Sequence, residues 1–454
     1  MLTKNKNSFL IFSSGVVIGL ILLNLVARDI FKRFDLTDNS MYSLSSSSKE
    51  IVSNLDDLLT MKVYFSDNLP NELGNTRRFL QDILEEYSAY SDEIRFFFHN
   101  PESDNNLEEE ARKDGIQPVQ MQVIENDKME VKRVLMGMVI LFEDNKETLP
   151  VIQTTTGLEY EITTKIKKLV DQNKPILGLV SVEGQTTPMQ NIQNALNERF
   201  DVRSLNLAEE VPPTINALLM GSVSDSLKSE EFNNLFSYLE RGGSLFLSQS
   251  RIKTNLQVQQ ALPIQSNIFS LLNSYGLDLQ NNLVIDQICG RVNVQQQMGP
   301  IRMNVPIEYP LLPVIRNFNV EESIVAGLEQ MQLIFASEIK QDSASMGSVS
   351  FQPLFYTSDN SGELRGNFNL NPDPQQNPFM RIFNRSKLIL GARSEKKNSN
   401  GSVSQVILVG DSEFISDEGG GRSPENQIFV LNSIDYLIGD KDLIALRSRE
   451  ITSR

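Results

Sequence analysis

The chain has 454 residues, which is enough for about three domains of ordinary size. Apolar residues make up 40% and charged residues 22%, a composition that supports a folded core rather than wholesale disorder. Acidic residues outnumber basic ones by 58 to 42, for a net charge of −16, which argues against a general binder of nucleic-acid phosphates. We therefore expect no nucleic-acid partner.

The chain has a single cysteine, Cys289, and a single histidine, His99. One Cys cannot form an internal disulfide, and these counts exclude a zinc site built from Cys and His. Any Ser-His-Asp or Cys-His mechanism would have to use His99. His99 follows a predicted strand and precedes Asn100-Pro101, so we interpret it as a turn residue. We interpret Cys289 as a buried, inert thiol.

The segment from Ser8 to Ala27 contains 20 residues and no charge. A helix of that length spans about 30 Å, the thickness of the hydrocarbon layer of a membrane. We predict an uncleaved membrane anchor with flanks over residues 1–34. A cleaved signal peptide and a buried soluble helix are the alternatives, although Asn24 to Ala27 followed by Arg28 is a poor cleavage site. Basic residues flank both ends, so charge alone does not fix the orientation; we favour an inside N-terminus and an exported bulk.

Residues 35–172 predict a small α/β domain. Strands are expected at 61–66 and 94–98 with an amphipathic helix at 76–89 between them, followed by strands up to Phe142 and a helix at 159–170. This βαβ…ββ order suggests a thioredoxin-like domain. The chain has no C-x-x-C motif, so disulfide exchange is excluded.

Residues 173–454 predict a larger α/β domain with a doubly wound parallel sheet. Apolar runs at 176–182, 217–220, 244–248 and 405–409 are typical of strands buried on both faces, and helices are expected at 189–200, 230–241 and 426–438. Residues 251–402 are rich in Gln, Asn, Ser and Pro and predict a long insertion. Within it we expect short strands at 283–285 and 333–335 and mobile loops at 372–378 and 394–401.

The glycine run Gly419-Gly420-Gly421 lacks the Lys and the spacing of a phosphate-binding loop, so we interpret it as a flexible loop. We expect no cofactor. In open parallel sheets, ligands bind beyond the carboxyl ends of the strands, where this chain places Glu183, Gln185, Asp225 and Asp411. The acids could form a metal or acid–base cluster, or they could cap the helices that follow. We favour caps, expect no metal and no catalytic residue, and keep these four as ligand-edge candidates.

Several different short motifs follow one another in a specific order along most of the chain. They are Arg33-Phe34-Asp35-Leu36-Thr37, Met41-Tyr42-Ser43-Leu44-Ser45, Gly115-Ile116-Gln117-Pro118-Val119, Leu158-Glu159-Tyr160-Glu161, Val409 to Ser416 and Leu446 to Glu450. In this order and spacing the chain resembles the auxiliary component of ABC transporters typified by the gliding-motility protein GldG.

The resemblance implies a non-catalytic partner of an ABC permease and of a separate ABC ATPase. It implies a single-pass protein of the inner (plasma) membrane whose bulk lies outside the cytoplasm, linked to gliding motility or surface export, with a cell-envelope protein or polymer as a further partner. It also implies that the second domain is similar to class I glutamine amidotransferases. Those enzymes carry a nucleophilic Cys after the strand that corresponds to 244–248, where this chain has Gln249-Ser250.

A second hypothesis is a small-ligand or carbohydrate-binding receptor, or a hydrolase, that uses Glu183, Asp225 and Asp411 at the carboxyl edge of the sheet. Acids that converge within about 5 Å in a closed pocket would favour this hypothesis, because shared burial perturbs their pKa values. Acids splayed in solvent would favour the interaction module.

Overall fold

The computed structural model describes residues 14–16 and 43–439, apart from residues 68, 70, 102–104, 126–127, 156, 171–173, 183–186, 299–300, 346 and 367. Of the predicted anchor at 8–27 it describes only residues 14–16, which are helical. No helix within the described ranges is both long and apolar enough to cross a membrane. The anchor and the division of the chain into residues 1–34, 35–172 and 173–454 stay predictions.

The first sheet has four strands in the order β2-β1-β5-β6. β1 (Leu59–Phe65) pairs in parallel with β2 (Ile94–His99) and antiparallel with β5 (Met136–Phe142), which pairs antiparallel with β6 (Asn145–Leu149). Helix α3 (Asn71–Tyr90) joins β1 to β2, since a parallel pair needs a crossover. The predicted βαβ…ββ order is confirmed. Between α4 (Asn105–Lys113) and β5 the chain forms an additional hairpin of β3 (Val119–Glu125) and β4 (Lys128–Val134).

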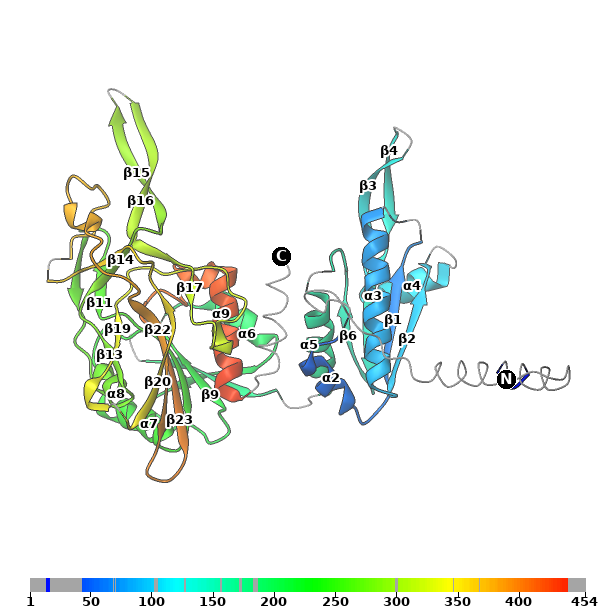
Figure 1. Cartoon of the computed structure of the whole chain (residues 1–454), viewed down its shortest axis with the longest axis horizontal. Helices are drawn as coiled ribbons and strands as arrows, with labels where there is room; N and C mark the ends of the chain where they lie inside the picture. The colour runs from blue at the N-terminus through cyan, green and yellow to red at the C-terminus, as the bar shows by residue number, and fades with distance from the viewer. Residues whose placement is uncertain are drawn as a thin grey trace, which may run out of the picture. The chain divides into compact units, whose positions relative to one another are not determined.

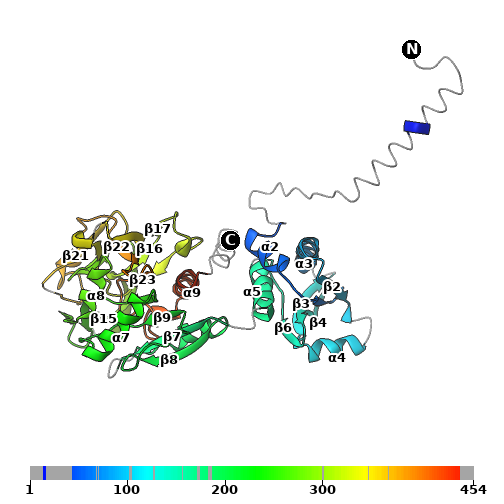
Figure 2. The ribbon, with the colours of Figure 1, turned by 90° about the horizontal axis from the view of Figure 1, so that it is seen from below.

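Helix α2 (Ser46–Ser53) lies beside α3 and α5 (Leu158–Val170), as Figure 2 shows. The buried hydroxyls of Ser48 and Thr163 lie 2.8 Å apart, and the Ser48 hydroxyl also donates to Glu159 at 2.7 Å. The Tyr87 hydroxyl on α3 reaches Thr163 at 2.5 Å. Polar side chains, rather than apolar contact alone, therefore hold these three helices in register.

The second sheet has eight strands in the order β17-β20-β22-β23-β10-β9-β7-β8 (Figure 1). Five of them are parallel, namely β7 (Ile176–Ser181), β8 (Asp201–Asn206), β9 (Ala217–Met220), β10 (Ser244–Ser248) and β23 (Val403–Val409). The other three extend the sheet in antiparallel fashion: β17 (Asn317–Phe318), β20 (Val349–Tyr356) and β22 (Ile389–Lys397). The sheet is therefore mixed.

Successive residues of the parallel strands enter two different cores, because side chains alternate across a sheet. Leu177, Leu179 and Leu219 pack on the face covered by α6 (Gln190–Asn197) and α9 (Pro424–Ile438). Leu218 and Met220 pack on the face of α7 (Ser229–Glu240) and α8 (Ile268–Ser274). Burial on both faces explains why these strands are apolar throughout, and it confirms the doubly wound arrangement for the five parallel strands.

The ends of α9 follow from local sequence signals. Ser423 caps the helix by accepting a hydrogen bond from the Asn426 amide, and Pro424 occupies the first turn. Gly439 ends the helix in the left-handed conformation with φ 90°, which a residue without a side chain adopts readily.

Segment 251–402 is more regular than its composition predicts, because it supplies β17, β20 and β22 of the main sheet. The prediction of a strand at 333–335 is wrong, since these residues form a bend after β18 (Met331–Gln332). The predicted loop at 394–401 is wrong in its first half, because residues 394–397 belong to β22. The strand predicted at 283–285 is confirmed as β14 (Leu283–Asp286).

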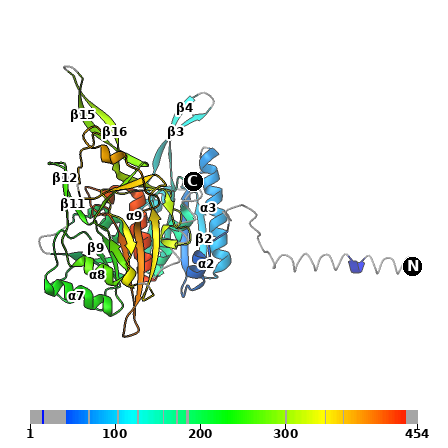
Figure 3. The ribbon, with the colours of Figure 1, turned by 60° about the vertical axis from the view of Figure 1, so that its left-hand side comes forward.

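The same segment forms smaller sheets beside the main one. They contain β11 (Ile252–Asn255), β12 (Gln260–Pro263), β13 (Leu277–Leu279), β19 (Ile339–Gln341), β21 (Ser361–Leu364) and the hairpin of β15 (Cys289–Met298) and β16 (Ile301–Ile315). The β15–β16 hairpin extends away from the body of the large sheet in Figures 1 and 3.

Candidate functional site

In the parallel part of the sheet, the chain leaves the neighbouring strands β7 and β9 toward opposite edges of the sheet. From β7 the chain passes to β8 on one side, and β9 pairs with the other side of β7. Connections that leave two neighbouring parallel strands in opposite directions open a crevice at their carboxyl ends, the usual ligand position in this architecture. The structure has a pocket of about 330 Å³ at this point, between the ends of β7 and β9.

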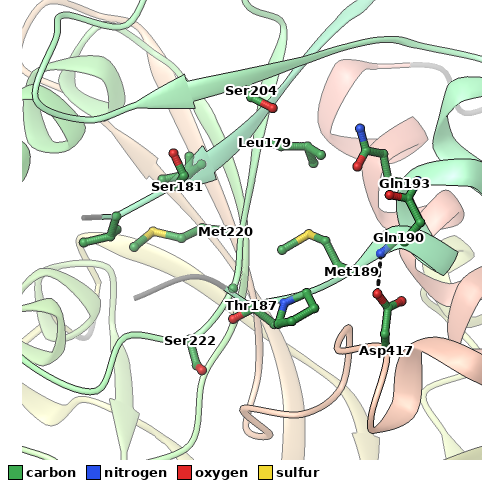
Figure 4. Close-up of a pocket in the computed structure, with 14 residues that line it drawn as sticks. Leu179, Ser181, Thr187, Met189, Gln190, Gln193, Ser204, Met220, Ser222 and Asp417 are labelled. Atoms are coloured by element: carbon green, nitrogen blue, oxygen red, sulfur yellow. Dashed lines mark hydrogen bonds between the residues drawn. The ribbon is translucent and has the colours of Figure 1, made fainter. Parts of the chain in front are cut away.

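Figure 4 shows the side chains that line the pocket. Its apolar part comes from Leu179, Val180, Val182, Pro188, Met189 and Met220. Its polar part consists of hydroxyl and amide side chains from β7, β8, β9, α6 and the adjoining loops: Ser181, Thr187, Gln190, Gln193, Ser204 and Ser222. One charged side chain, Asp417, completes the described lining.

Gly221 lets the loop before α6 approach the end of β9 closely. A Cβ at this position would lie 2.6 Å from Oγ1 of Thr187 and 2.8 Å from its Cβ. Both distances are well inside van der Waals contact, so any larger residue would displace Thr187. The glycine thus fixes one wall of the pocket.

Asp417 holds the first turn of α6 from a loop far along the chain. Its Oδ2 accepts a hydrogen bond from the Gln190 amide at 2.7 Å, and its Oδ1 accepts from the Asn191 amide at 2.9 Å and from the Asn191 side chain at 2.8 Å. The Asp417 amide in turn donates to the Pro188 carbonyl at 2.8 Å. These hydrogen bonds, with the Asn191 amide the largest cause, lower the pKa of Asp417. The N-cap residue of α6, Met189, makes no side-chain cap, so the Asp417 carboxylate caps this helix from 226 positions away in sequence.

Asp411, a predicted ligand-edge residue, lies at the end of β23 with no exposed surface. Its Oδ2 accepts from the Ile334 amide and its Oδ1 from the Glu413 amide, both at 2.7 Å. Burial raises its pKa to about 8 despite these hydrogen bonds. Asp411 therefore joins segment 333–337 to the sheet and has no access to ligand.

Asp225, the second predicted acid, is exposed in the loop after β9, where its Oδ1 accepts from the Ser226 amide at 2.7 Å. An exposed Asp225 and a fully buried Asp411 do not share a closed pocket, and neither lines the pocket described above. Glu183 and Gln185 lie outside the described residues. Asp417 is not among the predicted site residues, because it caps α6, which precedes it in the chain, whereas the helix that follows it, α9, is capped by Ser423.

Comparison with known proteins gives a family. The family model described as "ABC-type uncharacterized transport system" matches residues 155–444, and a model for a domain of unknown function matches residues 38–141. The chain belongs to the ABC-type uncharacterized transport system family. An uncharacterized protein of Borreliella burgdorferi is 24% identical over 476 aligned residues, which cover 99% of this chain and 91% of that protein.

Two solved structures give distant likenesses to this family member. The N-terminal domain of IFT52 aligns with a TM-score of 0.38 at 14% identity, over 58% of this chain and 97% of that one. A ThuA-like protein from Parabacteroides merdae aligns with a TM-score of 0.31 at 12% identity, over 59% of this chain and 91% of that one. Scores this low carry no argument about this protein.

In this transport-family protein, the position after β10 is filled by a structural amide. Gln249 is fully buried; its Oε1 accepts from the Val223 amide at 2.7 Å, and its Nε2 donates to the carbonyls of Val223 at 3.1 Å and Ser250 at 2.6 Å. An amide whose donors and acceptor are engaged with backbone groups ties two strand-end loops together. It offers no nucleophile where the resemblance to amidotransferases would place one.

Cys289 and His99 do not line the pocket between β7 and β9. Cys289 is half-buried at the start of β15, and burial raises its pKa to about 11, which disfavours the thiolate. His99 ends β2 and stacks on Tyr64 with 5.4 Å between ring centroids. In the part of the chain that the structure describes, no group of three His, Cys, Asp or Glu side chains could hold a metal ion.

A wider hollow of about 950 Å³ lies at the base of the β15–β16 hairpin.

Proposed function

We propose that this protein is a non-catalytic, membrane-anchored auxiliary subunit of an ABC transport system. The match of the transport-system family to residues 155–444 carries the proposal. Two features of the sequence agree with it. No phosphate-binding loop occurs in the chain, so ATP would be hydrolysed by another subunit. Gln249 follows β10, the position at which class I glutamine amidotransferases carry their nucleophilic Cys.

The uncharged segment 8–27 supports an anchor that places this chain beside a permease. The partners would then be an ABC permease and its separate ATPase in the inner (plasma) membrane. The α/β domains would lie outside the cytoplasm and bind a protein or polymer of the cell envelope, as in a GldG-type role in gliding or surface export.

A hydrolase that uses the strand-end acids has less support. It would need two acids to share one pocket, whereas Asp225 is exposed and Asp411 has no exposed surface.

Affinity purification of the full chain in a mild detergent tests the complex. A permease and a nucleotide-binding subunit should be recovered with it in stoichiometric amounts. Replacement of residues 8–27 by an unrelated apolar helix of equal length is the control, and it should reduce recovery if the anchor contacts the permease. Recovery of the chain alone, with all three subunits expressed, would overturn the proposal.

Cysteine labelling tests the location of the folded domains. Val320 is 90% exposed, so Val320→Cys gives an accessible thiol, and the wild type, with only half-buried Cys289, gives the background. A membrane-impermeant maleimide added to spheroplasts should label Val320→Cys before lysis. Labelling that appears only after lysis would place the domains inside the cytoplasm.

A further inference from the structure

The first turn of α6, at the rim of the pocket between β7 and β9, has its amides engaged by a side chain of the protein itself. Helix N-termini at the carboxyl edge of a parallel sheet commonly bind anions, because their free amides and the helix dipole favour negative charge. Here the Gln190 and Asn191 amides of α6 already donate to the carboxylate of Asp417. The protein's own anion thus occupies the position that a phosphate or carboxylate ligand would take.

The charge of the described lining points the same way. Asp417 is its one charged residue, so an anion would meet a like charge, and Arg422, which acts electrostatically on Asp417, does not line the pocket. A cation would have to compete with three N–H groups that already donate to the Asp417 oxygens. The described lining therefore favours neither charge sign.

The remaining lining suits a molecule that carries several hydroxyl groups. Ser and Thr hydroxyls and Gln amides each donate and accept, as hydroxyl groups do. The Ser181 hydroxyl donates to the Leu205 carbonyl at 3.1 Å, which leaves its oxygen lone pairs as acceptors. Met189 and Met220 add flexible, polarizable surface against which C–H groups can pack.

We propose that this pocket binds a neutral, polyhydroxylated small molecule of about the size of a monosaccharide, either free or as the end of a glycan. The volume of about 330 Å³ is at the lower end for ligand pockets, which sets the size. This inference does not rest on the proposed transport role, so either can fail while the other holds.

The test uses the full chain in lipid nanodiscs, because glucoside and maltoside detergents would themselves supply sugar. Saturation-transfer NMR and thermal shifts are measured with glucose, galactose, N-acetylglucosamine and myo-inositol, and with glucose 6-phosphate, inorganic phosphate and acetate as anionic probes. At least one neutral probe should bind, and its anionic counterparts should bind at least about tenfold more weakly. Matched disaccharides distinguish a glycan end from a free sugar.

Ser204 on edge strand β8 allows the pocket to be filled from an exposed position. Ser204→Phe should weaken binding of the neutral probe by about tenfold or more, since an aromatic side chain fits a strand and occupies the pocket. Arg203→Phe, which puts the same side chain on the opposite face of β8, should leave binding unchanged. Gln193→Leu gives a second test, with loss of binding at unchanged Tm, should Ser204→Phe lower the Tm.

Three results would overturn the inference. One is that no neutral probe binds. Another is that phosphate or acetate binds as tightly as the sugars. The third is that Ser204→Phe and Arg203→Phe have equal effects on binding.

Discussion

Asp411 and Asp417 belong to the same loop after β23, six positions apart, yet they lie in opposite environments. Asp411 has no exposed surface, and burial raises its pKa to about 8. Asp417 is half-buried at the rim of the pocket, and amide donors lower its pKa. Each accepts hydrogen bonds from backbone amides of a distant segment. The difference shows that solvent access, rather than residue type or position after a strand, decides the charge state of an acid at this edge.

Removal of the buried acid should have the largest effect on stability. Asp411→Ala leaves the amides of Ile334 and Glu413 buried without an acceptor, which costs about 3 kcal/mol in the free energy of unfolding. Urea denaturation followed by far-UV circular dichroism measures this, since the chain has no Trp. A loss below about 1 kcal/mol would mean that water or another group replaces the carboxylate.

The pH dependence of stability should also reflect the raised pKa of Asp411. Its pKa is about 8 in the folded chain and about 4 in the unfolded chain, so the native state binds one more proton between these values. The free energy of unfolding therefore falls as pH rises from about 4 to 8 and levels off above that range. Asp411→Asn lacks this contribution, so the stability of the wild type relative to this variant should decrease between pH 5 and 8. A constant difference would contradict the raised pKa.

Loss of the cap at the pocket rim should cost less. Asp417→Ala removes the side-chain acceptor of the α6 amides and should lower the free energy of unfolding by about 1 kcal/mol, a usual value for an N-cap. Glu418→Ala, one residue along and exposed, is the matched control and should change stability little. Equal effects of the two substitutions would show that the long-range cap contributes nothing.

The sequence alone was sufficient to predict the strands and helices that have a local hydrophobic pattern. β9 and β10 have the predicted bounds, because apolar runs report burial on both faces. β8 was missed, since Arg203 and Ser204 give an edge strand a polar composition. β20 and β22 were missed inside a polar segment, because their runs of buried residues are short, Leu354–Phe355 in β20 and Leu390–Ala392 in β22.

The sequence predicted where the candidate site lies, at the carboxyl edge of the sheet, but not the residues that line it. The carboxyl edge of the sheet does carry a pocket, yet Asp225 and Asp411 do not line it, and Asp417 and Ser204 do. No local signal marks Ser204, because a strand at the edge of a sheet and a strand that faces a pocket share the same polar pattern. The strand order β8-β7-β9, which opens the pocket, depends on pairings that the chain pattern does not encode.

The amino-acid sequence by itself determined the absence of a zinc site built from Cys and His, the apolar parallel strands and the alternation of strands with helices. The tertiary structure alone decided which acid is sealed in the core, which one caps a helix 226 residues away, and which strands complete the sheet. The reason is physical: periodicity and capping act over a few neighbouring residues, whereas burial of a carboxylate depends on which distant segments pack around it.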